Sequence, residues 1–291
     1  MPFHPRNTHQ GFYDLEQLVQ ACPELAPFLI TKKDGQTSLD FGQANTVFWL
    51  NKALLKTQYQ VHNWNLPDGA LCPPIPSRAD YLHHLADLLA GTAATIPKGK
   101  KTKILDIGTG ASCIYPLLGV KAYGWSFVGA DINLNSIQWA HQFLAEQPYW
   151  RQRVELRLQK KPQHIFEGII QPKDKFAASI CNPPFFSSAQ EALAQQQRKW
   201  QQLHPNQPSP NFGGQAHELH CQGGELAFIQ QMIKESSSFG HQVQWFTTLV
   251  AHEKHLQPLY KSLKKVPTIQ VETLDMQHGN KKSRLLCWRY Q

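Results

Sequence analysis

The sequence lacks any long apolar segment. No run among its 291 residues approaches the about 18–20 consecutive apolar residues of a membrane-spanning helix. The opening residues, Met1–Arg6, lack the apolar core of a signal peptide. Its six cysteines are dispersed, with no CxxC pair and no tight Cys/His cluster, which argues against zinc and against a disulfide framework. We therefore expect a cytoplasmic protein with free thiols, in which Cys113 and Cys181 are buried.

Several common catalytic motifs are also absent. The chain has no Walker Gly-Lys-Ser/Thr, no Gly-x-Ser-x-Gly and no His-Glu-x-x-His, so P-loop hydrolases, α/β-hydrolases and zinc proteases of that type are not indicated. Hydrophobic residues make up 41% of the chain and charged residues 17%, which is typical of a folded protein with a core. A net charge of +8 weakly favours a polyanionic partner.

The order of the expected elements indicates an α/β fold. Residues 1–75 combine turn-rich segments with two helices, and the stiff segment Cys72–Pro76 marks the boundary to a second domain at 76–291. Strands and helices then alternate, which predicts a parallel doubly wound sheet, and residues 187–224 interrupt them as a long substrate loop. The expected helices are Phe12–Cys22, Phe41–Tyr59, Tyr81–Leu89, Asn135–Glu146, Glu225–Glu235 and His252–Leu263. The expected strands are Lys103–Ile107, Trp125–Ala130, Val154–Leu158, Phe176–Cys181, Val243–Val250, Ile269–Asp275 and Arg284–Trp288.

A glycine-containing loop follows the first strand of the second domain. Asp106, Gly108, Gly110 and Ser112 lie in this loop, where glycines let the backbone turn sharply and approach a ligand. An ordinary strand-to-helix turn has the same pattern, and Ser112 departs from the Gly-x-Gly-x-x-Gly dinucleotide fingerprint. Asp131 ends the next strand, where a carboxylate either accepts the ribose hydroxyls of an adenosine cofactor or caps the following helix.

The motif Asn182-Pro183-Pro184-Phe185 follows the fourth strand. Its prolines cannot continue a β ladder, and Phe185 stands where a loop would usually turn polar. Adenine N6 is a weak nucleophile because its lone pair is delocalised into the ring. The Asn182 side-chain oxygen and the Pro183 carbonyl are suited to accept both amine protons, and Phe185 to stack on the base. The alternative is a proline-stiffened turn with phenylalanines in the core.

Three of these features are expected at one edge of the sheet. Gly108, Asp131 and Asn182 all follow the carboxyl ends of strands, where ligands bind in doubly wound folds. This combination matches S-adenosylmethionine-dependent methyltransferases better than nucleotide hydrolases or dehydrogenases.

The segments Asp106–Gly119, Cys181–Phe185 and Gly223–Glu225 together resemble the RlmF-type 23S rRNA adenine-N6 methyltransferases, which group with methyltransferase-like protein 16. The resemblance extends over essentially the whole chain. It implies a Rossmann-like class I methyltransferase domain with a small, mostly helical N-terminal module that assists RNA binding. It also implies S-adenosylmethionine as cofactor, no metal, and 23S rRNA or a large-subunit assembly intermediate as partner.

The resemblance also assigns roles by position. Arg78 would contact the cofactor carboxylate, Gly108 and Ser112 the methionine side, and Asp131 the ribose, while Lys160–Pro162 would lie close to the adenine. We therefore predict as catalytic residues Asn182, Pro183, Pro184 and Phe185, and as cofactor-binding residues Arg78, Asp106, Gly108, Gly110, Ser112, Asp131 and Asn182.

Basic residues gather toward the C-terminus. Two acidic residues, Glu272 and Asp275, stand against eight cations, namely Lys254, Lys261, Lys264, Lys265, Lys281, Lys282, Arg284 and Arg289. Such a cluster is usually a solvated surface, but around an active-site rim it favours contact with an RNA backbone. The cluster Lys98–Lys103 precedes the first strand and is expected at the wrong end of the sheet.

Other functions remain open at this level. A protein glutamine-N5 methyltransferase uses the same tetrapeptide, because a carboxamide nitrogen poses the same chemical problem. DNA adenine or cytosine-N4 methylation is a further option, although no target-recognition domain is evident. A non-catalytic RNA-binding module with a vestigial cofactor fold is the alternative from another class, and cofactor binding would distinguish it.

Overall fold

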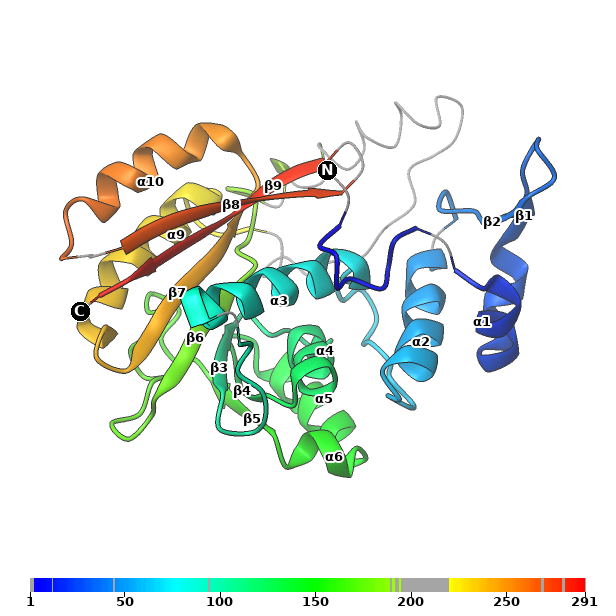
Figure 1. Ribbon diagram of the computed structural model, residues 1–291, viewed down its shortest axis with the longest axis horizontal. Helices are drawn as coiled ribbons and strands as arrows, with labels where there is room; N and C mark the ends of the chain where they lie inside the picture. The colour runs from blue at the N-terminus through cyan, green and yellow to red at the C-terminus, as the bar shows by residue number, and fades with distance from the viewer. Residues whose placement is uncertain are drawn as a thin grey trace.

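A computed structural model describes residues 3–11, 13–43, 45–93, 95–188, 190–191, 194, 220–267, 270–278 and 281–290. Its central feature is a seven-stranded sheet with the strand order β5-β4-β3-β6-β7-β9-β8 (Figure 1). The strands are β3 (Lys103–Ile107), β4 (Ser126–Asp131), β5 (Val154–Leu158), β6 (Phe176–Cys181), β7 (Val243–Val250), β8 (Gln270–His278) and β9 (Lys281–Arg289).

The sheet is mixed, whereas the sequence predicts a parallel one. The first five strands in the order pair in parallel, but β9 runs antiparallel to both β7 and β8. The reason is the connection, because β8 and β9 form a hairpin and only a longer crossover can make neighbouring strands parallel. The β8–β9 ladder continues to His278 and Lys281, so both strands are longer than predicted.

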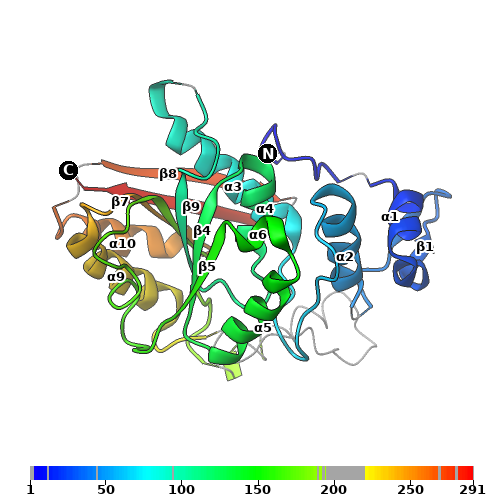
Figure 2. The same ribbon diagram turned by 90° about the horizontal axis from the view of Figure 1, so that it is seen from below.

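Helices cover both faces of the sheet (Figures 1 and 2). Residues of β3, β4 and β9 alternate between two separate apolar clusters, as the period-two geometry of a strand requires. Ile104 and Phe127 pack on one side, and Leu105 and Val128 on the other. The first side carries α3 (Ile75–Ala90), α4 (Ile114–Tyr123), α5 (Leu134–Ala145) and α6 (Pro148–Arg151), and the second α9 (Gly224–Ser236) and α10 (Leu256–Leu263).

Several helices differ from the prediction: α1 (Leu15–Ala21), α2 (Thr46–Gln58) and α10 begin later than expected, α3 begins earlier, and α6 was not predicted. α3 begins at Ile75, inside the predicted linker, because Pro74 precedes the helix and Pro76 stands in its first turn, where a missing N–H costs nothing. α4 was not predicted. Almost all of its residues are buried, so it lacks the one-sided apolar pattern by which a surface helix is recognised.

The N-terminal part contains α1 (Leu15–Ala21), α2 (Thr46–Gln58) and the short strands β1 (Leu29–Thr31) and β2 (Thr37–Leu39). It packs against the sheet domain through one shared apolar cluster. The His4 backbone N–H donates to Asp80 (2.7 Å), and the Trp64 indole donates to the Ser112 carbonyl (3.0 Å). The N-terminal part thus supports the glycine-containing loop directly. The division at 75/76 stays a prediction about domains.

The described cysteines are all free thiols, and Cys113 and Cys181 are buried as predicted. Among the residues described above, no helix combines the length and apolarity needed to cross a membrane.

Candidate active site

A cavity of about 580 Å³ opens at the carboxyl edge of the sheet, between the ends of β3, β4 and β6. Parallel strands bring their carboxyl ends to one edge, so residues that are far apart in the sequence meet there. The predicted site residues that line the cavity are Arg78, Gly108, Gly110, Ser112, Asp131, Asn182 and Pro184. Asp106, Pro183 and Phe185 do not line it.

The loop after β3 is fixed by its own backbone. The N–H groups of Gly108 and Thr109 both donate to the Ala130 carbonyl of β4 (2.8 and 3.0 Å). Gly108 has a φ of +75°, a left-handed conformation that favours glycine, and a Cβ there would meet no atom within 4 Å. The loop therefore leaves open space where a ligand can approach the main chain.

Asp131 joins this loop to the next helix. One carboxylate oxygen accepts the Gly110 N–H (2.9 Å) and the other the Asn133 N–H (2.9 Å). Asn133 in turn caps α5 by accepting the Ser136 N–H (3.0 Å). Both interpretations of Asp131 thus have support, because it anchors backbone groups near the helix start and also lines the cavity. A carboxylate oxygen keeps further acceptor capacity after one such bond.

Asp106 lies just behind the cavity. It is 1% exposed, and neither carboxylate oxygen has a hydrogen-bond partner among the described residues. Burial raises the pKa of Asp106 to about 7; the neighbouring Thr109 side chain opposes this rise, and the Asp131 carboxylate reinforces it. A buried acid without partners is costly for the ligand-free protein, and a cationic ligand group would offset that cost.

Asp106→Asn is expected to stabilise the ligand-free protein at neutral and alkaline pH. The pKa of Asp106 in the folded state, about 7, lies above its ordinary value of 3.8. The wild type therefore loses part of its stability as the pH rises from about 3.8 to about 7, because Asp106 ionises later in the folded than in the unfolded state. Asparagine cannot ionise, so the variant does not lose this stability. We expect the Tm advantage of the variant to grow between about pH 4 and pH 7, by on the order of 5 °C, and to level off at higher pH. A difference in Tm that does not change with pH would contradict this assignment.

The tetrapeptide leaves β6 at the cavity edge. Asn182 and Pro184 line the cavity and are partly exposed, whereas Pro183 is buried. Phe185 is partly buried outside the cavity lining. The Phe186 carbonyl accepts the Cys221 N–H (3.0 Å), which ties the end of the tetrapeptide loop to the segment before α9.

Gly224 and Glu225 connect this loop to the turn after β7. A Cβ on Gly224, whose φ is +64°, would lie 3.3 Å from the Ser187 nitrogen, so glycine permits the close approach. The fully buried Glu225 carboxylate accepts the Ala251 N–H (2.6 Å) and lies 2.6 Å from Nδ1 of His255. The Gly223–Glu225 motif therefore holds two loops together at the site.

Arg78 comes from the first turns of α3 and donates to the Ser77 hydroxyl (2.9 Å). It lines the cavity, so it is not simply a surface cation at the start of the helix. Within the segment Lys160–Pro162, only Pro162 lines the cavity, and the two lysines are exposed.

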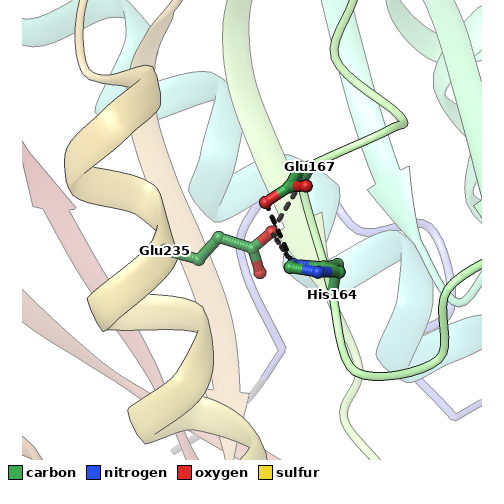
Figure 3. Close-up of side chains that lie close together, drawn as sticks. All are labelled: His164, Glu167 and Glu235. Atoms are coloured by element: carbon green, nitrogen blue, oxygen red, sulfur yellow. Dashed lines mark hydrogen bonds and ion pairs between the residues drawn. The ribbon is translucent and has the colours of Figure 1, made fainter.

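A histidine–carboxylate cluster lies beside the cavity (Figure 3). Ligand atoms of His164, Glu167 and Glu235 are within 4.8 Å of one another. The Glu235 carboxylate, however, already accepts the backbone N–H groups of Ile165, Phe166 and Glu167 (2.7, 3.2 and 2.7 Å). These bonds account for Glu235 as an anchor of the turn, and the absence of a metal from the activity stays a prediction.

Sequence reasoning missed several cavity residues. Among them are Leu71 just before the predicted linker, Pro73 within it, Tyr115 from α4, Ile132 after β4, and His220 and Cys221 before α9. Ile132 is 46% exposed. An apolar residue directly after an acidic strand end is the signal that could have identified it. Tyr115 lies in the segment Asp106–Gly119 that carries the family resemblance, but no sequence signal marks this residue itself as a ligand contact.

Comparisons with known proteins agree with this geometry. A family model described as RNA methyltransferase matches residues 1–291. The chain is 48% identical over 293 residues to ribosomal RNA large subunit methyltransferase F of Flavobacterium johnsoniae, covering 99% of this chain and 93% of that protein. The protein of the same name from Citrobacter koseri is 48% identical over 288 residues, with the same coverage.

Solved structures show the same fold. The hMettl16 catalytic domain in complex with MAT2A 3'UTR hairpin 1 has a TM-score of 0.84 and 25% identity, covering 100% of this chain and 96% of that one. The N-terminal domain of human METTL16 in complex with SAH has a TM-score of 0.77 and 23% identity, with both chains covered fully. The predicted Rossmann-like methyltransferase fold is confirmed.

Proposed function

The chain belongs to the RNA methyltransferase family, and from this premise we propose that it methylates the N6 amine of an adenine in 23S rRNA, using S-adenosylmethionine. The observation that carries the proposal is the meeting of Asn182 with the Gly108–Ser112 loop and Asp131 around one cavity. The relatives named as large-subunit rRNA methyltransferases support the choice of RNA. The same family membership weighs against protein glutamine as the substrate.

The residues present fit the cofactor. The glycine loop provides open space at Gly108, Asp131 provides acceptors for ribose hydroxyls, and Asp106 is a buried acid without a partner among the described residues. Arg78 supplies a cation for a carboxylate. S-adenosylmethionine, when bound, supplies an activated methyl group.

The tetrapeptide performs the positioning step. The Asn182 amide oxygen and the Pro183 carbonyl accept the two amine protons of the target adenine, which directs its lone pair along the line of transfer. Prolines at 183 and 184 hold that carbonyl with little conformational freedom. Phe185 lies next to these acceptors in the chain and offers an aromatic face to a base withdrawn from its stack. The methylated amine then loses a proton to water, so no strong base is required.

The proposal is tested with 23S rRNA from cells that lack this protein, to which the purified protein and methyl-labelled S-adenosylmethionine are added. Mass spectrometry of ribonuclease fragments should find one new N6-methyladenine. Parallel reactions with free rRNA and with large-subunit assembly intermediates identify the true substrate, which we propose is one of these two. Methyl transfer to protein but not to RNA would overturn the proposal. We also propose a cytoplasmic location, where such substrates are made.

Topology divides the basic residues into two groups. Lys254 follows β7, which is parallel to β6 and ends at the cavity edge. Lys282 lies there too, because β9 pairs antiparallel with β7 and Val250 is opposite Arg284. Lys264 and Lys265 follow α10, which returns to the far edge. Arg284 is bound to Glu253 (2.6 Å), and Arg289 lies over the Trp245 ring (4.9 Å), so neither is a simple surface cation.

We expect the double variant Lys254→Gln/Lys282→Gln to bind RNA with lower affinity, and this affinity to depend less on salt concentration than that of the wild type. Each lost phosphate contact should lower the log–log salt slope by about 0.7–0.9. The matched control is Lys264→Gln with Lys265→Gln, which removes the same charge at the far edge and should keep the wild-type slope. Binding titrations over a range of salt concentrations measure both. Equal slopes for the two double variants would show that RNA docks elsewhere.

We propose that residues 1–75 assist RNA binding. Leu71 and Pro73 lie at the end of this module and line the cavity, which places the module's end beside the site. Removing the module is a poor test, because Trp64 donates to the Ser112 carbonyl and its loss would disturb the cofactor loop. Point substitutions of exposed residues test the proposal without that effect.

A further inference from the structure

Tyr115 places a buried hydroxyl at the wall of the cavity. The residue is 4% exposed and lines the cavity, and its hydroxyl has no hydrogen-bond partner among the described residues. Leaving a buried hydroxyl without a partner is unfavourable unless a bound molecule completes it. A donor in this state at a ligand cavity is therefore the mark of a binding residue.

The neighbouring Tyr81 differs from Tyr115, because its hydroxyl is hydrogen-bonded within the protein. The rings of Tyr81 and Tyr115 pack edge to face, with centroids 5.4 Å apart. The Tyr81 hydroxyl bonds with that of Thr247 (2.8 Å) and accepts the Cys181 N–H (3.3 Å). Tyr81 does not line the cavity. The Tyr81 hydroxyl is therefore bound to residues of the sheet, whereas the Tyr115 hydroxyl is available to a ligand.

The charges around Tyr115 indicate which part of a ligand it meets. Burial raises the pKa of Tyr115 far above its usual range, while the positive charge of Arg78 opposes and Asp106 reinforces that rise. Tyr115 thus stays protonated and can donate, and it lies near one cation and one buried acid. These charges suit a ligand group with a carboxylate for Arg78 and Tyr115 and with an ammonium on the side of the buried Asp106, as an α-amino acid has.

We propose that the Tyr115 hydroxyl donates a hydrogen bond to the α-carboxylate of the methionine part of the cofactor, beside Arg78. The inference rests on the proposed function, because it takes S-adenosylmethionine as the ligand. Tyr115 is a binding residue for the amino-acid end, whereas Asp131 at the end of β4 serves the nucleoside end.

Tyr115→Phe tests the inference, because it removes only the hydroxyl. Titration calorimetry with S-adenosylhomocysteine should show affinity lower by roughly 10- to 100-fold, the loss expected for a hydrogen bond to a charged group. The affinity for 5'-methylthioadenosine, which has no amino-acid end, should stay within about two-fold of the wild type, a change too small to represent a lost hydrogen bond. The Tm without ligand should not fall, because the hydroxyl forms no hydrogen bond with any residue that the structure describes.

Tyr81→Phe is the matched control. It removes the hydroxyl that bonds to Thr247 and Cys181, so its Tm should fall while both ligands bind as they do to the wild type. Equal binding of S-adenosylhomocysteine by Tyr115→Phe and the wild type would overturn the inference, as would an equal loss for both ligands. Failure of the wild type to bind S-adenosylhomocysteine would instead reject the proposed function.

Discussion

Asn182→Ala is expected to reduce methyl transfer to RNA by on the order of 10²-fold or more. The variant loses the acceptor that orients the amine, and the Pro183 carbonyl alone cannot hold both protons. Affinity for S-adenosylhomocysteine should fall far less than activity, because the main role proposed for Asn182 is toward the base, although the sequence also predicts it as a cofactor-binding residue. Single-turnover methylation and calorimetry measure the two effects separately.

Asn182→Asp is the matched control for this experiment. It keeps an acceptor oxygen in nearly the same place, so it should retain more activity than the alanine variant. An Asn182→Ala protein that is well folded and retains most of its activity would show that the tetrapeptide is only a stiff turn. A parallel loss of cofactor affinity and activity would assign Asn182 to the cofactor instead.

The sheet domain was largely predictable because its strands carry local signals. The predicted bounds of Lys103–Ile107 and Phe176–Cys181 agree with β3 and β6, since short apolar runs here end at polar or glycine-rich turns. The antiparallel β8–β9 pair was less predictable, because strand direction depends on the connection and on neighbours distant in the sequence. The substrate loop 187–224 lies largely outside the described residues.

The site was predictable to the extent that it lies at strand ends. Gly108, Asp131 and Asn182 meet at the cavity because a parallel sheet brings such ends to one edge. Tyr115 was missed because it lies on a helix buried all round, where no sequence pattern distinguishes a residue that faces a ligand from one that packs. Arg284 was wrongly grouped with the cations available to RNA. Its ion pair with Glu253 depends on a contact between β9 and the turn after β7, which the sequence does not show.

Asp131→Ala is expected to weaken S-adenosylmethionine binding by roughly 1.5–3 kcal/mol, the value of a hydrogen bond to a charged group. The carboxylate also accepts the Gly110 N–H and the Asn133 N–H, so its removal loosens the glycine loop as well. Both effects reduce affinity, and isothermal titration measures their sum.

Asn133→Ala separates the helix cap from the ligand site. It removes the side chain that accepts the Ser136 N–H at the start of α5 but keeps the backbone N–H that Asp131 binds. This variant should lose about 1 kcal/mol of stability, as other N-cap substitutions do, and bind the cofactor almost normally. If Asp131→Ala behaved like Asn133→Ala, losing stability but not affinity, Asp131 would be an anchor of the backbone, and the ribose would have to bind to another group in the cavity.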